Sequence, residues 1–215
     1  MIRPAVIEDL PHIAAIYDAI FDQEERGPVY TNWKRGSYPT ADDARKAIEV
    51  GTLYAGEDDA GFIWGVVNFN GIQLPEYAAI PWSIPADPEQ VGVIHTLCIH
   101  PAQSGKGYAR RTVAFCEDLG RAQGKTVIRL DTWEHNLPAN RLYPSLGYRF
   151  AGATEFFFHG FVRENLNCYE KKLCQRQIEI VRKRRRNFVV FRRWGNKISC
   201  FLAQKECSQF AVSGA

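Results

Sequence analysis

The sequence predicts a mixed α/β fold in which helices cover both faces of one central sheet. Short apolar strands alternate with amphipathic helices, for example Val93–Ile99 followed by a helix over residues 104–122. Two earlier strands on either side of Glu57–Gly61 have the pattern of an antiparallel hairpin. At 215 residues and 46% hydrophobic content, the chain is long enough to bury one good core.

The N-terminal half contains five expected elements. They are a strand at Ile2–Pro4, an amphipathic helix at Ile7–Phe21, a helix from Thr40 to about Val50, and hairpin strands at Leu53–Gly56 and Phe62–Phe69. The first helix turns apolar residues inward, namely Leu10, Ile13, Ala14, Tyr17 and Ile20. Thr40 is an N-cap with Asp42 and Asp43 in the first turn, and Gly51 ends that helix. Four prolines predict an irregular connection over residues 70–90.

The C-terminal half continues the alternation. After Val93–Ile99 and the helix over 104–122, we expect a strand at Thr126–Thr132, a short helix after Asn136, and closing strands at Thr154–Phe158 and Leu166–Leu173. Gly124 is a stop signal for the long helix. Pro138 suits the first turn of the short helix, and Pro144 should kink it or end it near Tyr143.

Composition excludes several classes of protein. No run of eighteen apolar residues occurs, so no membrane span is expected. Arg3, Glu8 and Asp9 interrupt the N-terminus, and no apolar segment typical of a signal peptide follows. The six cysteines form no CxxC pair and no metal-ligand spacing, so we expect reduced thiols, a cytoplasmic location and no metal site.

Charge divides the chain into an expected domain over residues 1–173 and a basic extension over residues 174–215. The extension holds ten Lys or Arg and two Glu, whereas residues 1–173 hold 17 basic and 22 acidic residues. Basic and aromatic residues mix between Arg182 and Trp194. Three alternatives stay open: the extension binds RNA or another anionic partner, adds a strand to a sheet edge in a homodimer, or is a solvated or loosely docked tail.

A glycine-rich turn, Gln103–Ala109, joins the strand ending at Ile99 to the long helix. Such a turn points several backbone N–H groups at one spot, where the helix dipole adds positive charge, so it is typical of a phosphate site. The Lys lies between the glycines, which excludes a P-loop. Arg110 occupies the position that a dinucleotide loop keeps small, although Asp131 follows the next strand as a ribose-binding acid would. An ordinary glycine turn is the remaining alternative.

A second motif, Asn136–Tyr148, favours one further interpretation of the glycine turn. Its Asn-x-x-Ala-x-x-hydrophobic-Tyr-x-x-Leu-Gly-Tyr pattern resembles the GNAT superfamily of N-acetyltransferases, with matches at Asn136, Ala139, Leu142, Tyr143, Leu146, Gly147 and Tyr148. Gly105-Lys106-Gly107-Tyr108-Ala109 also resembles a common form of the family's pyrophosphate loop, although Gln103 fits the strict form only loosely. The resemblance covers about residues 1–173 and implies a mostly antiparallel sheet of about seven strands that splays between its fourth and fifth strands.

The same resemblance implies acetyl-CoA as cofactor and transfer of its acetyl group, by direct attack, to a primary amine of a small molecule or a peptide. The implied cofactor-binding residues are Leu97, Cys98, Ile99, Gln103, Ser104, Gly105, Lys106, Gly107, Tyr108, Ala109, Asn136, Asn140 and Tyr143. Tyr143 matches the family tyrosine that protonates the departing thiolate. His95 is the candidate base, because relatives carry a base on this strand; a structural His, Glu134 and a water relay are alternatives.

The sequence specifies the acceptor site less well than the cofactor-binding and catalytic residues. Four aromatic residues fall in the two loops that flank the acceptor side of the family fold, Trp33, Tyr38, Tyr77 and Trp82. They either line an aromatic pocket for the amine or pack the loops. A second function class also stays open, an acetyl-CoA-binding module whose basic tail binds RNA or another anionic partner.

Overall fold

The computed structural model describes residues 1–158, 162–174, 190–194 and 197–201. Contacts divide the chain into two units, Met1–Gln175 and Arg176–Ala215. In the second unit, β8 (Val190–Trp194) pairs antiparallel with β9 (Lys197–Phe201). The basic run Arg182–Arg186, on which the nucleic-acid prediction depends, lies outside the described residues. The predicted boundary at residue 173 stays a prediction.

The first unit contains seven strands and four α-helices among its described residues. The strands are β1 (Ile2–Pro4), β2 (Leu53–Glu57), β3 (Ile63–Asn70), β4 (Val91–Ile99), β5 (Val127–Trp133), β6 (Arg149–Phe158) and β7 (Val162–Lys172). The helices are α1 (Leu10–Arg26), α2 (Ala41–Glu49), α3 (Tyr108–Ala122) and α4 (Leu137–Ser145). Short 3₁₀ turns occur at η1 (Ile7–Asp9), η2 (Pro75–Ala79), η3 (Pro88–Gln90) and η4 (Pro101–Gln103).

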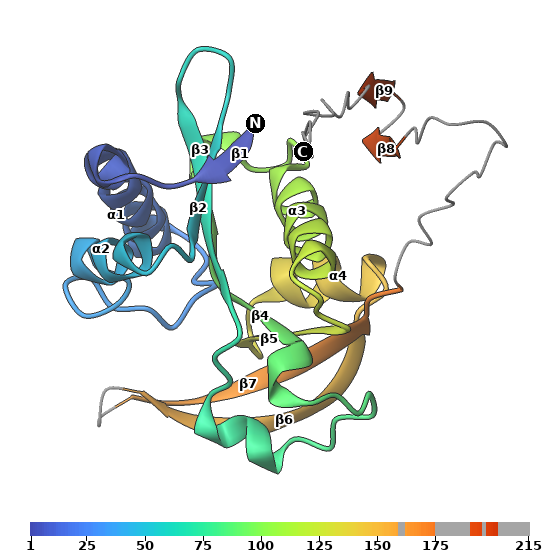
Figure 1. Cartoon of the computed structure of the whole chain (residues 1–215). Coiled ribbons are helices and arrows are strands. Elements are labelled where there is room, and N and C mark those ends of the chain that lie inside the picture. The colour runs from blue at the N-terminus through green and yellow to red at the C-terminus, as the bar shows by residue number, and fades with distance from the viewer. Residues whose placement is uncertain (159–161, 175–189, 195–196, 202–215) are drawn as a thin grey trace, which may run out of the picture. The chain divides into compact units, whose positions relative to one another are not determined.

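The seven strands form one sheet in the order β1-β2-β3-β4-β5-β7-β6. Every neighbouring pair is antiparallel except β4 and β5, which are parallel. Helices α1 and α2 cover one face and α3 and α4 cover the other (Figure 1). The predicted fold class is confirmed. Among the described residues, no helix has the length and apolarity that a membrane span requires.

Apolar periodicity explains how the helices pack. Leu10, Ile13 and Tyr17 of α1 are buried as predicted, and Ile16, which was not predicted to face inward, is buried in the same cluster. On the opposite face, Val113 and Cys116 of α3 are buried in a second apolar cluster. Because each helix buries one side only, α1 and α3 cover opposite faces of the sheet.

Several predicted boundaries are wrong. The long helix begins at Tyr108 and not at residue 104, because Gly105 and Gly107 have φ of 75° and 80°, which right-handed helix excludes. The short helix continues through Pro144 to Ser145. Strand β6 begins at Arg149, five residues earlier than predicted, because Arg149 already pairs with Glu170 of β7. The start of β6 depends on its register with Glu170, 21 positions farther along the chain, and so leaves no pattern near Arg149.

The parallel pair β4–β5 separates partway along its length. Only Val91–Ile94 of β4 pair with Val127–Leu130 of β5. Beyond this point β4 stays with β3 as far as Ile99, and β5 stays with β7 as far as Trp133. The separation coincides with a bulge in β4, where Thr96 has a φ of 44°, which is unusual for a β-branched residue. The fourth and fifth strands therefore splay apart, as the sequence resemblance implies.

Candidate active site

The glycine turn presents a row of free backbone donors. The backbone N–H groups of residues 105–110 have no hydrogen-bond acceptor among the described residues. The first helical bond runs from the Arg111 N–H to the Gly107 carbonyl. Because these donors lie at the N-terminus of the 15-residue helix α3, its dipole adds partial positive charge there. The arrangement is suited to an anion with several oxygens, such as a pyrophosphate.

Side chains around the turn leave it open. A Cβ built on Gly105 or Gly107 would meet no atom within 4 Å, so positive φ and not lack of space requires glycine there. Lys106 Nζ donates to Gln103 Oε1 at 2.8 Å, which holds its ammonium group beside the free donors. Arg110 Nη2 donates to Ser145 Oγ at 3.0 Å and ties α3 to α4. The predicted phosphate-loop residues are thus brought together on one exposed surface.

The second part of the site is the edge of β4 at the splay. The His100 N–H donates to the Trp64 carbonyl of β3 at 2.9 Å. Backbone groups alternate between the two edges of a strand, so Leu97 and Ile99 direct theirs away from β3, toward the edge that β5 has left. The Cys98 side chain is instead buried in the cluster under α1, where burial raises the pKa of its thiol. By the same alternation its backbone groups point toward β3, so Cys98 contributes no donor to this edge.

Tyr143 of α4 lies close to the splay. The side chain is 6% exposed and packs between Tyr148 and Tyr169, with both ring centroids at 5.8 Å. Burial raises its pKa above the usual range for a phenol, and the charge of Asp131 raises it further. The cap of α4 fixes its position, because Asn136 Oδ1 accepts from the Ala139 N–H at 3.1 Å.

Asn140 is engaged entirely within the protein. Its Nδ2 donates to the carbonyls of Trp133, Glu134 and Asn136, at 2.9, 3.1 and 2.9 Å. Its Oδ1 accepts from Asn167 Nδ2 at 2.9 Å and from the Tyr169 hydroxyl at 2.8 Å. These bonds tie α4 to β5 and β7, so Asn140 positions the helix that carries Tyr143.

Asp131 is a residue that the sequence analysis did not propose for catalysis. It follows Leu130, the last residue of β5 that pairs with β4, and therefore begins the splayed segment. Its Oδ2 accepts a hydrogen bond of 2.7 Å from the Tyr77 hydroxyl. Burial raises the pKa of Asp131 to about 6, although the Tyr77 hydrogen bond opposes the rise. Its only sequence signal was an acid directly after an apolar strand.

His95 of β4 is half-buried just before the bulge. Its Nε2 donates to the Ile72 carbonyl at 3.1 Å, which leaves Nδ1 as the acceptor. Burial lowers the pKa of His95, so the ring is neutral at pH 7. The alternative base, Glu134, is 41% exposed at the end of β5, with the His135 ring at 3.7 Å.

The four predicted acceptor aromatics form two separate pairs. Trp33 and Tyr38 meet edge to face at 5.9 Å, and the Tyr38 hydroxyl bonds the hydroxyl of Thr96 at the bulge. Tyr77 and Trp82 meet at 5.1 Å, and Tyr77 is 2% exposed. Tyr77 therefore packs in the core and holds Asp131, whereas Tyr38 reaches the splay from the other loop.

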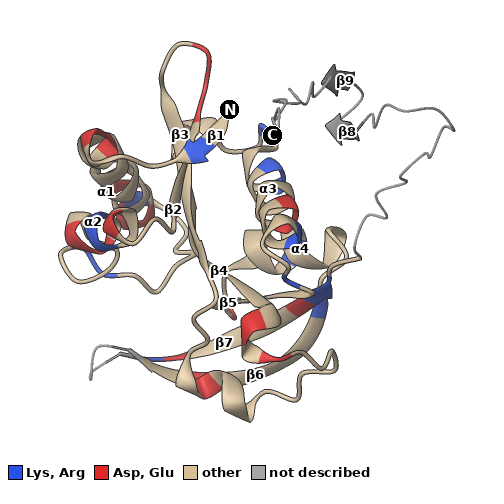
Figure 2. Ribbon diagram, viewed as in Figure 1, with Lys and Arg blue, Asp and Glu red and all other residues tan. Residues whose placement is uncertain are grey.

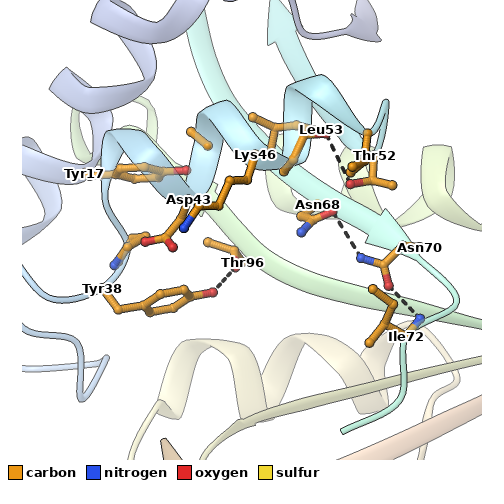
Figure 3. A pocket seen from close by; sticks show the side chains of 14 residues that line it. Tyr17, Tyr38, Asp43, Lys46, Thr52, Leu53, Asn68, Asn70, Ile72 and Thr96 are labelled. Carbon is orange, nitrogen blue, oxygen red and sulfur yellow. Dashed lines mark hydrogen bonds between the residues drawn. The ribbon is translucent and has the colours of Figure 1, made fainter. Parts of the chain in front are cut away.

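A cavity of about 330 Å³ lies beside the bulge, and of the four aromatics only Tyr38 lines it. Figure 3 shows its walls, with Tyr17, Tyr38 and Asp43 at one end and Thr52, Asn70 and Ile72 at the other. Thr96 forms part of its lining, so the cavity reaches the point where β4 and β5 separate. Burial raises the pKa of Tyr38 to about 12, and the charges of Asp43 and Asp131 add to that shift.

Trp82 lines a different cavity, of about 460 Å³, together with Arg129. The guanidinium carbon of Arg129 lies 4.4 Å from the centre of the Trp82 ring. Among the described residues, no group of three or more His, Cys, Asp or Glu is arranged to hold a metal ion.

Comparison with known proteins identifies the family to which this chain belongs. A family model described as the acetyltransferase (GNAT) family matches residues 12–148, more than half of the chain. The N-acetyltransferase YycN of Bacillus subtilis, a protein described as uncharacterized, is 29% identical over 82 residues. That match covers 36% of this chain and 53% of YycN, so it spans about half the length of this curated relative.

Solved structures share the fold. An N-acetyltransferase from Staphylococcus aureus Mu50 superposes with a TM-score of 0.59 at 22% identity, covering 81% of this chain and 98% of that one. The protein yncA from Salmonella typhimurium, solved with its cofactor acetyl-CoA, gives a TM-score of 0.58 at 20% identity. That match covers 82% of this chain and 95% of yncA.

Proposed function

The chain belongs to the GNAT family of acetyltransferases, and we propose that it transfers the acetyl group of acetyl-CoA to the primary amine of a small molecule, by direct attack within a ternary complex. Acetyl-CoA is the cofactor of this family, whose members are acyl-CoA-dependent N-acetyltransferases. The observation that carries the proposal is the free edge of β4, which begins opposite the segment of β5 that starts with Asp131 and leads to the donor row before α3.

The residues present fit the cofactor. The free N–H groups of residues 105–110 and the ammonium of Lys106 would hold the pyrophosphate, which needs several donors at one place. The backbones of Leu97 and Ile99 would bind the pantetheine arm as a further strand binds a free edge. In this proposal Asn136 and Asn140 act by holding α4 and not by contact with the cofactor.

When bound, acetyl-CoA supplies a thioester whose carbonyl carbon accepts the amine and whose sulfur leaves. The β4 backbone at Leu97 would donate a hydrogen bond to the carbonyl oxygen and so stabilise the negative charge that develops there. The next residues, Cys98 and Ile99, pair with Val66 and Gly65 of β3, which would hold this donor in place from one side.

Asp131 is the proposed base. A carboxyl whose pKa is near 6 is ionised at pH 7 and more basic than an ordinary aspartate, so it takes the proton from the amine nitrogen more readily. Tyr77 fixes the Asp131 carboxyl through the 2.7 Å hydrogen bond. His95 remains the second candidate, because its neutral ring has a free Nδ1. The two candidates give different pH profiles when each is replaced.

Tyr143 is the proposed acid. Its hydroxyl donates a proton to the departing sulfur, and the raised pKa of the phenol does not prevent this. The ordinary pKa values of a thiol and a phenol are about 8.5 and 10, and burial would raise both in the same direction.

The acceptor would enter from the face that α1 and α2 cover, through the cavity beside Thr96. Tyr38 lines this cavity and bonds Thr96, so it separates the acceptor from the β4 bulge.

An amine panel with detection of free thiol tests the proposal. We expect amine-dependent thiol release, lost in Asp131→Asn and strongly reduced in Tyr143→Phe, with acetyl-CoA binding preserved in both. The same assay on a truncated chain ending at Leu173 tests the alternative. Full activity there supports the small-molecule enzyme, whereas activity lost together with salt-sensitive RNA binding supports a module that acts through its tail. The homodimer stays a prediction, which sedimentation of the full chain tests.

A further inference from the structure

One wall of the 330 Å³ cavity carries an ordered pair of opposite charges. Asp43 and Lys46 both line the cavity, and both belong to α2. Residues three apart lie on the same helix face about one turn from each other, so a carboxylate and an ammonium follow one another along this wall. Figure 2 shows acidic and basic positions together on α2, and Figure 3 shows the two side chains facing the same space.

Asp43 and Lys46 can each still bind a polar group of a ligand. Asp43 Oδ2 accepts from the Thr40 N–H at 2.9 Å and the Thr40 hydroxyl at 2.7 Å, whereas its Oδ1 has no partner among the described residues. Lys46 forms no ion pair or hydrogen bond with a described residue. The neighbouring Arg45 differs, because its guanidinium lies 3.9 Å from Asp42 and outside the cavity lining.

The end of the cavity that contains Asp43 is the reactive end. Asp43 and Asp131 both act on the Tyr38 hydroxyl, which in turn bonds Thr96 at the bulge. An ammonium group held by Asp43 Oδ1 and Tyr38 therefore lies next to the splay. The Lys46 side chain reaches back along α2 toward the same end of the cavity (Figure 3).

The remaining walls add an amide donor and an apolar surface. Asn68 Oδ1 accepts from Asn70 Nδ2 at 3.3 Å, which leaves the Nδ2 group of Asn68 without a partner among the described residues. Figure 3 shows Asn68 beneath the Lys46 stem. The apolar residues that line the cavity are Ala47, Val50, Leu53 and Ile72.

We propose, on the premise of the acetyl transfer proposed above, that the acceptor is a zwitterionic amino acid with an apolar side chain. Its ammonium nitrogen lies at Asp43 and Tyr38, its carboxylate at Lys46 and Asn68, and its side chain against Val50 and Ile72. A plain amine cation has no group for Lys46, and repulsion by the Lys46 ammonium offsets its attraction to Asp43. A peptide N-terminus lacks the carboxylate as well.

Matched acceptors test this inference. Phenylalanine, phenethylamine and phenylalanine amide share one ring and differ in the carboxylate, so their kcat/KM values, each divided by the fraction of free amine at the assay pH, isolate its contribution. We expect phenylalanine to exceed the other two by about fivefold, since an exposed ion pair contributes up to about 1 kcal/mol. Lys46→Met removes this preference, and Lys46→Glu reverses it in favour of phenethylamine. Arg45→Met and Arg45→Glu, which change the same charge outside the cavity, leave the preference intact.

Equal kcat/KM for phenylalanine and phenethylamine in the unchanged protein would overturn the amino-acid acceptor, as would a preference that survives Lys46→Glu. Both outcomes leave acetyl transfer itself standing. Acetyl-CoA binding without transfer to any of the three acceptors or to a wider amine panel would instead contradict the proposed function. The two failures are therefore distinguishable in one set of assays.

Discussion

Replacing Tyr77 with phenylalanine changes the pKa of the proposed base without touching the proposed acid. The substitution removes one hydroxyl, and the phenyl ring keeps its contacts with Trp82 and Phe156 at 5.1 and 6.0 Å. The hydroxyl donates a 2.7 Å hydrogen bond to Asp131, which stabilises the ionised carboxylate and so lowers its pKa. Without this bond the pKa of Asp131 rises above its present value of about 6.

The strength of the hydrogen bond between Tyr77 and Asp131 sets the size of the rise in the pKa of Asp131. A hydrogen bond to a charged group contributes about 1.5 kcal/mol, which corresponds to a rise of about one pKa unit. At pH 6 the ionised fraction of Asp131 then falls from about a half to about a tenth, so kcat/KM falls about fivefold. Above pH 8.5 both proteins have Asp131 ionised, and their kcat/KM values converge.

The pH profile of kcat/KM, followed by free-thiol release with one amine at low concentration, measures this directly. Using the same amine for both proteins cancels the ionisation of the amine itself. Tyr143→Phe is the matched control, because it removes another buried hydroxyl and should lower the rate at every pH without moving the acid limb. An acid limb that stays in place in Tyr77→Phe, or moves to lower pH, would refute Asp131 as the base.

Three further changes test other parts of the account. Tyr143→Phe should lower kcat at least about tenfold while the Kd for acetyl-CoA, measured by calorimetry, stays constant; an unchanged kcat removes Tyr143 from the chemistry. Gly107→Ala places a side chain at a φ of 80° and should weaken acetyl-CoA binding about fivefold, since this conformation costs about 1 kcal/mol, whereas Ser104→Ala should not; equal affinities would contradict the loop. Asp131→Asn should abolish activity yet raise the melting temperature at pH 7.5. The pKa of Asp131 in the fold is about 6 against an ordinary 3.8, so stability is lost as pH rises between these values and the neutral amide avoids that loss; a lower melting temperature at pH 7.5 would contradict the buried charge.

Local patterns predicted much of this architecture. The apolar period of α1, the N-cap at Thr40 and the glycine turn each depend on residues within one or two turns of chain. Such signals can be recognised in a single sequence because the same few residues both form and terminate the element. The motif at Asn136–Tyr148 placed α4 for the same reason.

The parts of the site that the sequence did not predict depend on contacts between residues that are far apart in the chain. Tyr77 and Asp131 are 54 positions apart and meet only because Tyr77 is buried in the same apolar cluster as Val127 of β5. Neither has a neighbour in sequence that reveals this hydrogen bond, so Tyr77 is predicted as a pocket aromatic and Asp131 only as a ribose-binding acid in a rejected alternative. Asn140 is a similar case, because its partners Asn167 and Tyr169 belong to β7. A side chain that positions a site residue from another helix or strand cannot be recognised in the sequence until the pairing of the strands is known.

Transfer of a labelled acetyl group tests the central claim most directly. The full chain is incubated with isotopically labelled acetyl-CoA and a panel of amino acids and their decarboxylated amines, and the products are analysed by mass spectrometry beside free-thiol release. The account predicts an N-acetylated product that contains the label and forms in equal amount to the thiol, absent in Asp131→Asn. Thiol release without any acetylated amine, or acetyl-CoA binding without either product, would contradict it.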